Sequence, residues 1–181
     1  ADIVMETPAA LAALPARLLD AASQRSLFRI GIGLYAARNV PTAALDSVDR
    51  LKDLLRRAES VGYVDPATGA LNGTYIAAML ATIGIADELK PKIRLLPSGL
   101  TTFDPVAAGD VHIAFGRITD IRADKRVRLI SALPDAVQNY ARYDAALLAS
   151  AANRPAAIAL LDVMTSANMQ PVLRELGFDA P

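Results

Sequence analysis

The chain has 181 residues, of which 53% are hydrophobic and 21% are charged, with 19 basic and 19 acidic side chains. This length provides one sizeable core or two small lobes. A net charge of zero gives no overall field that attracts nucleic acid or an anionic membrane. The absence of cysteine excludes disulfides and thiolate metal sites, and a single histidine, His112, does not support a His-rich metal site or a Ser-His-Asp triad. We therefore expect no metal, no cofactor and no nucleic-acid partner.

The first strand and the first helix give one weak candidate for a ligand contact. Residues 2–6 predict a strand, and a helix is predicted from residue 9 to about residue 19 despite a proline within it. Thr7 lies at the carboxyl end of the strand, where open α/β sheets bind ligands, although a Thr before Pro is more often part of a turn. Residues 28–36 predict a longer strand.

The most informative stretch is residues 61–84, which predicts a short strand, a loop punctuated by Gly and Pro, and a helix. Asn72 is the predicted N-cap of that helix. The first amide groups of a helix have no partner within it and lie at the positive end of its dipole, so they form a site for an anion. The small residues Gly73 and Thr74 allow a ligand to approach the backbone. An ordinary capped helix that binds nothing is the alternative.

Two further strands, residues 92–96 and 111–115, flank a short helix. Ser98 follows the first of them and is a weaker candidate for a ligand contact. The second is nearly continuous in apolar character, as expected where helices cover both faces of a parallel sheet. His112 within it is therefore predicted to be a packed or edge residue rather than a catalyst.

Arg117 comes just after the strand of residues 111–115, at an end where a charge can face a cleft. Its planar guanidinium suits a carboxylate or another oxyanion. A surface ion pair with Asp120 or Asp124 is the alternative.

The remaining pattern continues the alternation of strands and helices. Tyr140 and Tyr143 precede a strand at residues 145–148, and either hydroxyl is able to donate to a ligand or to remain in water beside a packed ring. The rhythm predicts an α/β fold with mixed, mostly parallel sheets. We expect a first lobe formed by residues 1–36 and 141–181. A second lobe, residues 41–135, is inserted into it. The chain is expected to cross between the lobes at two hinges, residues 28–40 and 136–145.

Several short motifs, in their order along the chain, resemble one family. They are Ala1-Asp2-Ile3-Val4-Met5, Gly31-Ile32-Gly33-Leu34, Tyr63-Val64-Asp65-Pro66, Gly73-Thr74-Tyr75, residues 108–115, Leu133-Pro134, Tyr143 and Leu176-Gly177-Phe178. Together they are similar to the molybdate-binding-protein-like family of extracellular solute-binding proteins, two-lobed clamshells of the type II periplasmic class that serve ABC transporters.

The resemblance implies a ligand cleft contacted by Asn72, Gly73, Ala114 and Tyr143, a periplasmic location and a transporter permease as partner. It also implies that about one more strand-helix-strand-helix normally precedes the segment matching Ala1. Residues 1–5 lack the basic flank and the long apolar region of a signal peptide, and no apolar run approaches the roughly 20 residues that span a bilayer. The first lobe is therefore expected to be incomplete, with a preceding segment or a partner chain to complete it.

Three functions remain open at this point. Members of the family hold oxyanions with neutral donors, whereas Arg117 favours a small organic carboxylate over a molybdate-like ion. Some relatives in the wider family look like isomerases of small unsaturated tricarboxylic acids, such as aconitate isomerase, for which Tyr143, Tyr140 or Asp65 would act as acid or base. Similar folds also occur as cytoplasmic ligand-sensing domains.

Overall fold

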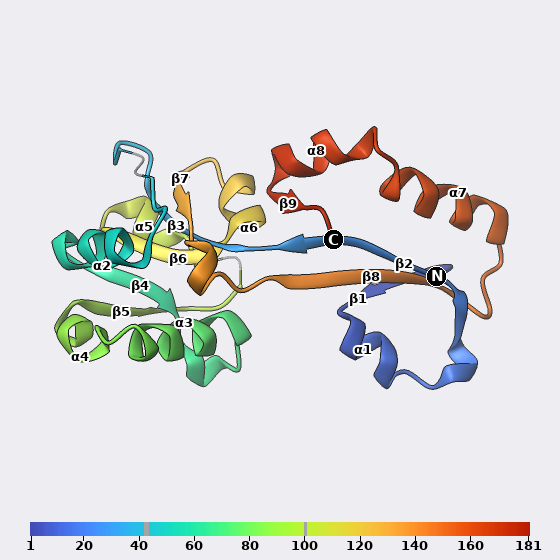
Figure 1. Cartoon of the computed structure of the whole chain (residues 1–181), viewed down its shortest axis with the longest axis horizontal. Coiled ribbons are helices and arrows are strands. Elements are labelled where there is room, and N and C mark those ends of the chain that lie inside the picture. Colours follow the sequence, from blue (N-terminus) through green and yellow to red (C-terminus); the bar gives the residue numbers. More distant parts are fainter. Residues whose placement is uncertain (42–43, 100) are drawn as a thin grey trace. The chain divides into compact units, whose positions relative to one another are not determined.

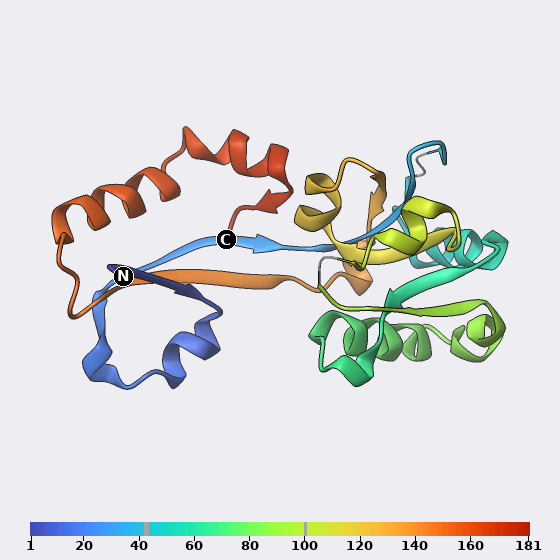
Figure 2. The same ribbon diagram turned by 180° about the vertical axis from the view of Figure 1, so that it is seen from behind.

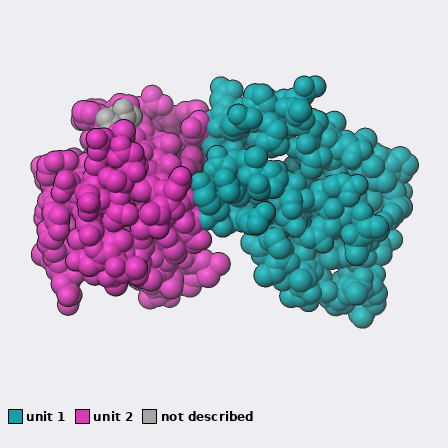
Figure 3. Space-filling model, viewed as in Figure 1, with its two compact units in different colours: residues 1–30, 140–181 teal, residues 31–139 magenta. Residues whose placement is uncertain are grey.

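The computed structural model describes residues 1–41, 44–99 and 101–181 (Figure 1). Residues 42, 43 and 100, which fall within the expected second lobe, lie outside the described residues. The chain divides into two compact units, unit 1 (residues 1–30 and 140–181) and unit 2 (residues 31–139), which Figure 3 colours separately. Both changes of unit fall within the two expected crossings, whose role as hinges stays a prediction.

Unit 1 is built on a four-stranded sheet in which every neighbouring pair is antiparallel. In order across the sheet, the strands are β1 (Ile3–Glu6), β8 (Ala141–Leu148), β2 (Leu19–Ile30) and β9 (Phe178–Asp179). One face of the sheet carries α7 and α8, and the other carries α1 (Figures 1 and 2). The helices are α1 (Pro8–Ala13), the 3₁₀ helix η1 (Ala16–Leu18), α7 (Arg154–Thr165) and α8 (Met169–Leu176).

The core of unit 1 joins β2 and β8 to α7. Leu27 and Phe28 of β2 pack with Ala157 and Leu161 of α7, so that the apolar face of the sheet is removed from water. No single helix among the described residues has the length and apolar character to cross a bilayer. Only α7 and α8 taken together meet that criterion, and they are bent by 70° at their junction.

Two expectations for unit 1 are corrected by the structure. The first helix ends at Ala13, not near residue 19, because Leu14 precedes a proline and takes the extended conformation that Pro15 imposes on its neighbour. The long strand begins at Leu19 rather than at residue 28, and Gly31 separates it from the next strand, which belongs to the other sheet.

Unit 2 contains a mixed five-stranded sheet. In order, its strands are β5 (Ile93–Leu96), β4 (Val61–Val64), β6 (Ile113–Arg117), β3 (Ile32–Ala37) and β7 (Val127–Ala132). β4 pairs in parallel with β5 and β6, whereas β3 pairs antiparallel with β6 and β7. Across both sheets the described pairs are mostly antiparallel. The expected α/β fold with mixed sheets is confirmed, but the expectation of mostly parallel pairing was wrong. Every described pair in unit 1 is antiparallel, and β3, which enters unit 2, runs against both of its neighbours.

Alternating residues of β3 and β6 supply the two cores of unit 2. Leu34 and Phe115 point into a core formed with α2, α3 and α4, whereas Tyr35 and Ala114 point to the opposite face, against α5 and α6. This period of two, with both faces apolar, is what a sheet covered by helices on both sides requires. The helices of unit 2 are α2 (Val48–Arg57), η2 (Pro66–Thr68), α3 (Leu71–Thr82), α4 (Ala86–Leu89), η3 (Lys90–Lys92), α5 (Asp104–Ala108), α6 (Ile118–Ala123) and η4 (Asp135–Val137).

Buried Tyr35 predicts a loss of stability at alkaline pH. Its side chain is fully buried and its hydroxyl donates to the Thr102 carbonyl at 3.4 Å. Burial, with a smaller contribution from the charge of Asp124, raises the pKa of Tyr35 well above its usual value near 10. The stabilisation from the neutral phenol is therefore complete below about pH 10 and declines as the pH rises above it, since the unfolded chain ionises first. We expect the free energy of unfolding to fall between about pH 10 and 12, and to fall less in Tyr35→Phe; equal slopes for the two proteins would contradict this assignment.

Candidate functional site

The loop between β4 and α3 is shorter than the sequence predicts, because α3 begins two residues earlier. Asp65 follows β4 and caps η2, its Oδ1 accepting the Ala67 N–H at 2.9 Å. Gly69 then adopts a left-handed conformation, and α3 begins at Leu71 with Ala70 in the N-cap position. The prediction that Asn72 is the N-cap was wrong, because the Thr74 N–H already bonds the Ala70 carbonyl at 3.2 Å and so starts the helix two residues earlier.

The N-terminus of α3 has no side-chain cap. Asn72 lies in the first turn, and its Oδ1 accepts the neighbouring Gly73 N–H at 3.0 Å. Thr74 is exposed and its hydroxyl donates back to the Ala70 carbonyl at 3.4 Å. Leu71, at the first helical position, is 86% exposed. The helix has 12 residues and Ala70 provides no capping side chain, so its positive end can interact with an anion through the first-turn N–H groups other than that of Gly73.

Gly73 serves packing rather than ligand access. It is buried, and a Cβ at this position would lie 2.1 Å from the Val64 carbonyl oxygen and 3.0 Å from the Val64 carbonyl carbon. The glycine therefore lets α3 rest directly on the end of β4. Our expectation that its missing side chain opens the backbone to a ligand is not supported, since that side of the residue faces protein.

Three of the predicted loops meet at one edge of the sheet of unit 2. Because β4, β5 and β6 are parallel neighbours, their carboxyl ends share an edge. Ser98 follows β5 there and is exposed, α3 follows β4, and Arg117 is the last residue of β6. Open sheets bind ligands at such an edge.

Arg117 is engaged in the alternative ion pair. Its Nε donates to Asp120 Oδ2 at 2.9 Å, with side-chain exposures of 46% and 41%. A half-exposed pair of this kind contributes at most about 1 kcal/mol. Arg117 is thus a surface cation whose present partner is held only weakly.

Ala114 and His112 have structural positions. Ala114 is fully buried, and it lies in the middle of the sheet between its strand partners Tyr35 of β3 and Gly62 of β4. It therefore presents no exposed atom to a ligand in this structure. His112 precedes β6, where its Nδ1 accepts the Glu59 N–H at 3.2 Å.

The remaining candidates belong to unit 1. Thr7 caps α1, its Oγ1 accepting the Ala10 N–H at 3.3 Å. Tyr143 lies in β8 with its ring centroid 5.7 Å from that of Phe28. Tyr140 lies under the Arg29 guanidinium, 4.1 Å from its ring centroid. Their contacts with a ligand stay predictions.

Two hydrogen-bonded contacts of unit 2, near the edge of the sheet at which α3 begins, were not predicted from the sequence. The Tyr75 hydroxyl of α3 donates to the Val137 carbonyl at 2.8 Å, and burial raises the pKa of Tyr75. The Gln138 amide bonds Ile32 twice, accepting its N–H at 2.8 Å and donating to its carbonyl at 2.9 Å. Both link segments distant in sequence, which no local pattern encodes. Among the described residues, no group of His, Asp and Glu side chains is placed to hold a metal.

Comparison with known proteins places this geometry in context. The family model described as bacterial extracellular solute-binding protein matches residues 2–179. The chain is 25% identical over 183 residues to an aconitate isomerase of Pseudomonas sp., covering 98% of the chain and 66% of that relative. Its fold is similar to that of the substrate-binding domain assigned to a molybdenum ABC transporter of Clostridium difficile (TM-score 0.78, 16% identity, 99% and 77% of the two chains). It is also similar to the periplasmic molybdate-binding protein of Azotobacter vinelandii (TM-score 0.66, 14% identity, 99% and 78%).

Proposed function

Because the chain belongs to the bacterial extracellular solute-binding protein family, we propose that it captures a small anion for an ABC transporter, with an organic carboxylate favoured over a molybdate-like oxyanion. The observation that carries the proposal is the uncapped N-terminus of α3, at the same sheet edge as Arg117. The same proposal assigns the protein to the periplasm and gives it a transporter permease as partner.

The proposed site combines two kinds of donor. Backbone N–H groups at a helix N-terminus attract either a carboxylate or a tetrahedral oxyanion, so they do not discriminate between them. Arg117 adds a cation whose planar fork pairs with an anion in two parallel hydrogen bonds. Because the oxyanion binders that the sequence resembles are expected to use neutral donors, this added cation is the reason to favour a carboxylate. Exchanging Asp120 for a ligand carboxylate costs little, since the pair is half exposed.

A matched pair of substitutions tests the role of Arg117. We expect Arg117→Gln to weaken citrate or cis-aconitate binding by about tenfold or more, since it removes a charge-assisted contact. Asp120→Asn frees the guanidinium and is expected to leave binding unchanged or to strengthen it. Isothermal titration of the full chain and both variants with citrate, cis-aconitate and molybdate measures the effect. Tight molybdate binding that is retained in Arg117→Gln would overturn the preference for a carboxylate, and failure to bind any of the three anions would overturn anion capture.

The similarity to an aconitate isomerase favours a second candidate, isomerisation of a small unsaturated tricarboxylic acid on the same scaffold. Of the three candidate acids or bases, Asp65 lies nearest the start of α3 in sequence, and it is half-buried, with Oδ1 accepting the Ala67 N–H. Tyr140 and Tyr143 are the other candidates. Proton NMR of cis- or trans-aconitate in D₂O distinguishes the two functions: turnover or exchange of a carbon-bound proton indicates the enzyme, and saturable binding without exchange indicates the binding protein.

A further inference from the structure

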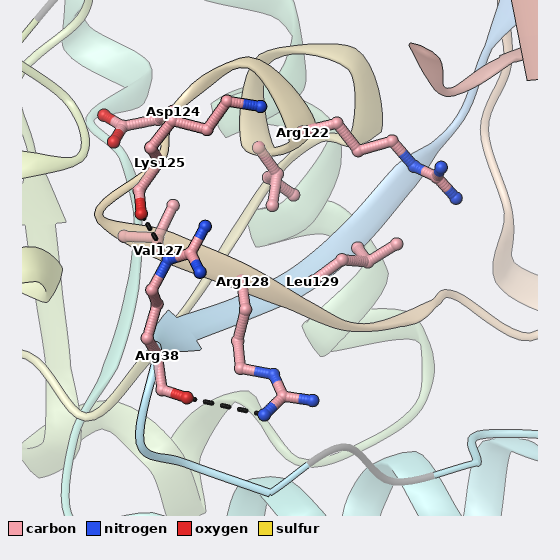
Figure 4. Close-up of a pocket in the computed structure, with 8 residues that line it drawn as sticks. Arg38, Arg122, Asp124, Lys125, Val127, Arg128 and Leu129 are labelled. Atoms are coloured by element: carbon pink, nitrogen blue, oxygen red, sulfur yellow. Dashed lines mark hydrogen bonds between the residues drawn. The ribbon is translucent and has the colours of Figure 1, made fainter. Parts of the chain in front are cut away.

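A hollow of about 250 Å³ lies at the opposite edge of the sheet in unit 2 (Figure 4). Antiparallel pairing places Ile32 of β3 beside Arg117, and Ala37 at the other end of β3 beside Val127. The hollow is formed at this second end, by the residue after β3, by α6 and by the start of β7. It is therefore distinct from the edge at which α3 begins. Its lining residues are Arg38, Ile121, Arg122, Asp124, Lys125, Val127, Arg128 and Leu129.

The charges around this hollow are strongly unequal, although the whole chain is neutral. Four of its lining side chains are basic and a single one, Asp124, is acidic. Arg126 already engages that acid, its Nη2 donating to Asp124 Oδ2 at 2.7 Å and its backbone N–H to Oδ1 at 2.8 Å. The hydrogen bond from Arg126 holds the pKa of Asp124 below its usual value. Asp124 therefore does little to neutralise the other cations.

Three of the four cations, Arg38, Lys125 and Arg128, have no acidic partner within the described part of the chain. Arg38 Nε donates to the Lys125 carbonyl, and Arg128 Nη1 donates to the Arg38 carbonyl at 3.4 Å. Figure 4 shows Arg38 between Lys125 and Arg128, with Arg38 directed at the Lys125 backbone and Arg128 directed at the Arg38 backbone. Carbonyl groups orient the guanidinium groups in this arrangement without removing their charge.

The lining beneath the charges is apolar. Ile121 and Val127 are 1% and 2% exposed, and Leu129 packs against the same core. Charges beside an apolar surface are less screened than charges on a fully solvated one, so their mutual repulsion and their attraction for an anion both increase. An anion that spans several of the cations relieves the repulsion.

We propose that this hollow is a second binding site, for a small oxyanion that carries several negative charges, such as a pyrophosphate or another polyphosphate group. The volume admits a ligand of that size, and arginine forks match phosphate oxygens in pairs. The site is independent of the anion site at α3, because the two lie at opposite edges of the sheet.

Titration of the full chain with pyrophosphate tests the proposal. We expect saturable binding that weakens by about tenfold or more in the double variant Arg38→Gln/Arg128→Gln, and that also weakens at higher ionic strength. Lys125→Gln provides a second variant in case the double variant folds poorly, since Lys125 is exposed. Circular dichroism establishes that each variant is folded.

Two controls distinguish this site from general basicity and from the edge at α3. Arg94→Gln removes an exposed arginine of β5 that likewise donates to carbonyl groups, those of Pro91 and Ile93, and it is expected to leave pyrophosphate binding unchanged. Arg117→Gln is expected to have no effect either. Absence of saturable pyrophosphate binding, or a loss of affinity in either control as large as in the double variant, would overturn the second site.

Discussion

Replacing Gly73 by alanine is expected to destabilise the protein by about 3 kcal/mol, although alanine is ordinarily the better helix former. A glycine-to-alanine change within a helix usually stabilises it by about 0.5–1 kcal/mol. Here the added Cβ would lie 2.1 Å from the Val64 carbonyl oxygen. The atoms that it would meet belong to the backbone, so no flexible side chain can move away from it. The helix must shift from the end of β4. Chemical denaturation measures the loss, and the anion affinity at α3 is expected to fall with it.

Gly84→Ala is the matched control for Gly73→Ala. Gly84 has a positive φ of 76°, but a Cβ added to it would meet nothing within 4 Å. The substitution therefore incurs backbone strain alone, about 1–2 kcal/mol. A Gly73→Ala protein that is as stable as the parent, or more stable than Gly84→Ala, would show that α3 does not rest on Val64 as described.

Gln138→Leu is expected to lower the free energy of unfolding by about 2–3 kcal/mol. Leucine fills a similar space but removes four hydrogen bonds, those with the Ile32 N–H and carbonyl at 2.8 and 2.9 Å, the Asn139 N–H at 3.0 Å and the Leu133 carbonyl at 3.4 Å. Ile32 is 4% exposed, so water does not easily replace the lost acceptor. The two linked residues lie close to the unit boundaries, Ile32 just after the boundary at residues 30–31 and Gln138 just before the one at residues 139–140.

The neighbouring residue provides the control for Gln138→Leu. Asn139 is exposed and uses its backbone N–H, not its side chain, in this cluster. Asn139→Ala is therefore expected to change stability by less than about 0.5 kcal/mol. Denaturant titration of the two variants tests the contrast; equal stabilities would show that the Gln138 amide does not hold the two segments together.

The sequence predicted the family and the alternation of elements, and the match over residues 2–179 confirms the resemblance to molybdate-binding-like solute-binding proteins. Gly177, directly after α8, adopts the left-handed conformation that glycine commonly takes after a helix. The main predictions that were wrong are the N-cap at Asn72 and the mostly parallel pairing of the strands. Capping preference is a weak local signal, and here the left-handed Gly69 and the extended Ala70 fixed the helix start before Asn72 was reached.

What the sequence determined by itself is the set of surfaces: apolar residues at period two or at helical spacing fix which side of each element is buried, as Leu34 and Tyr35 do for the two faces of β3. Only the tertiary structure decided which elements those surfaces meet. It brought Arg38, at the end of β3, beside residues 121–129 and set Gly73 against Val64. The physical reason is that burial of a face is a property of the local chain, whereas strand partners and close backbone contacts arise between segments far apart in sequence and leave no periodic trace in either one.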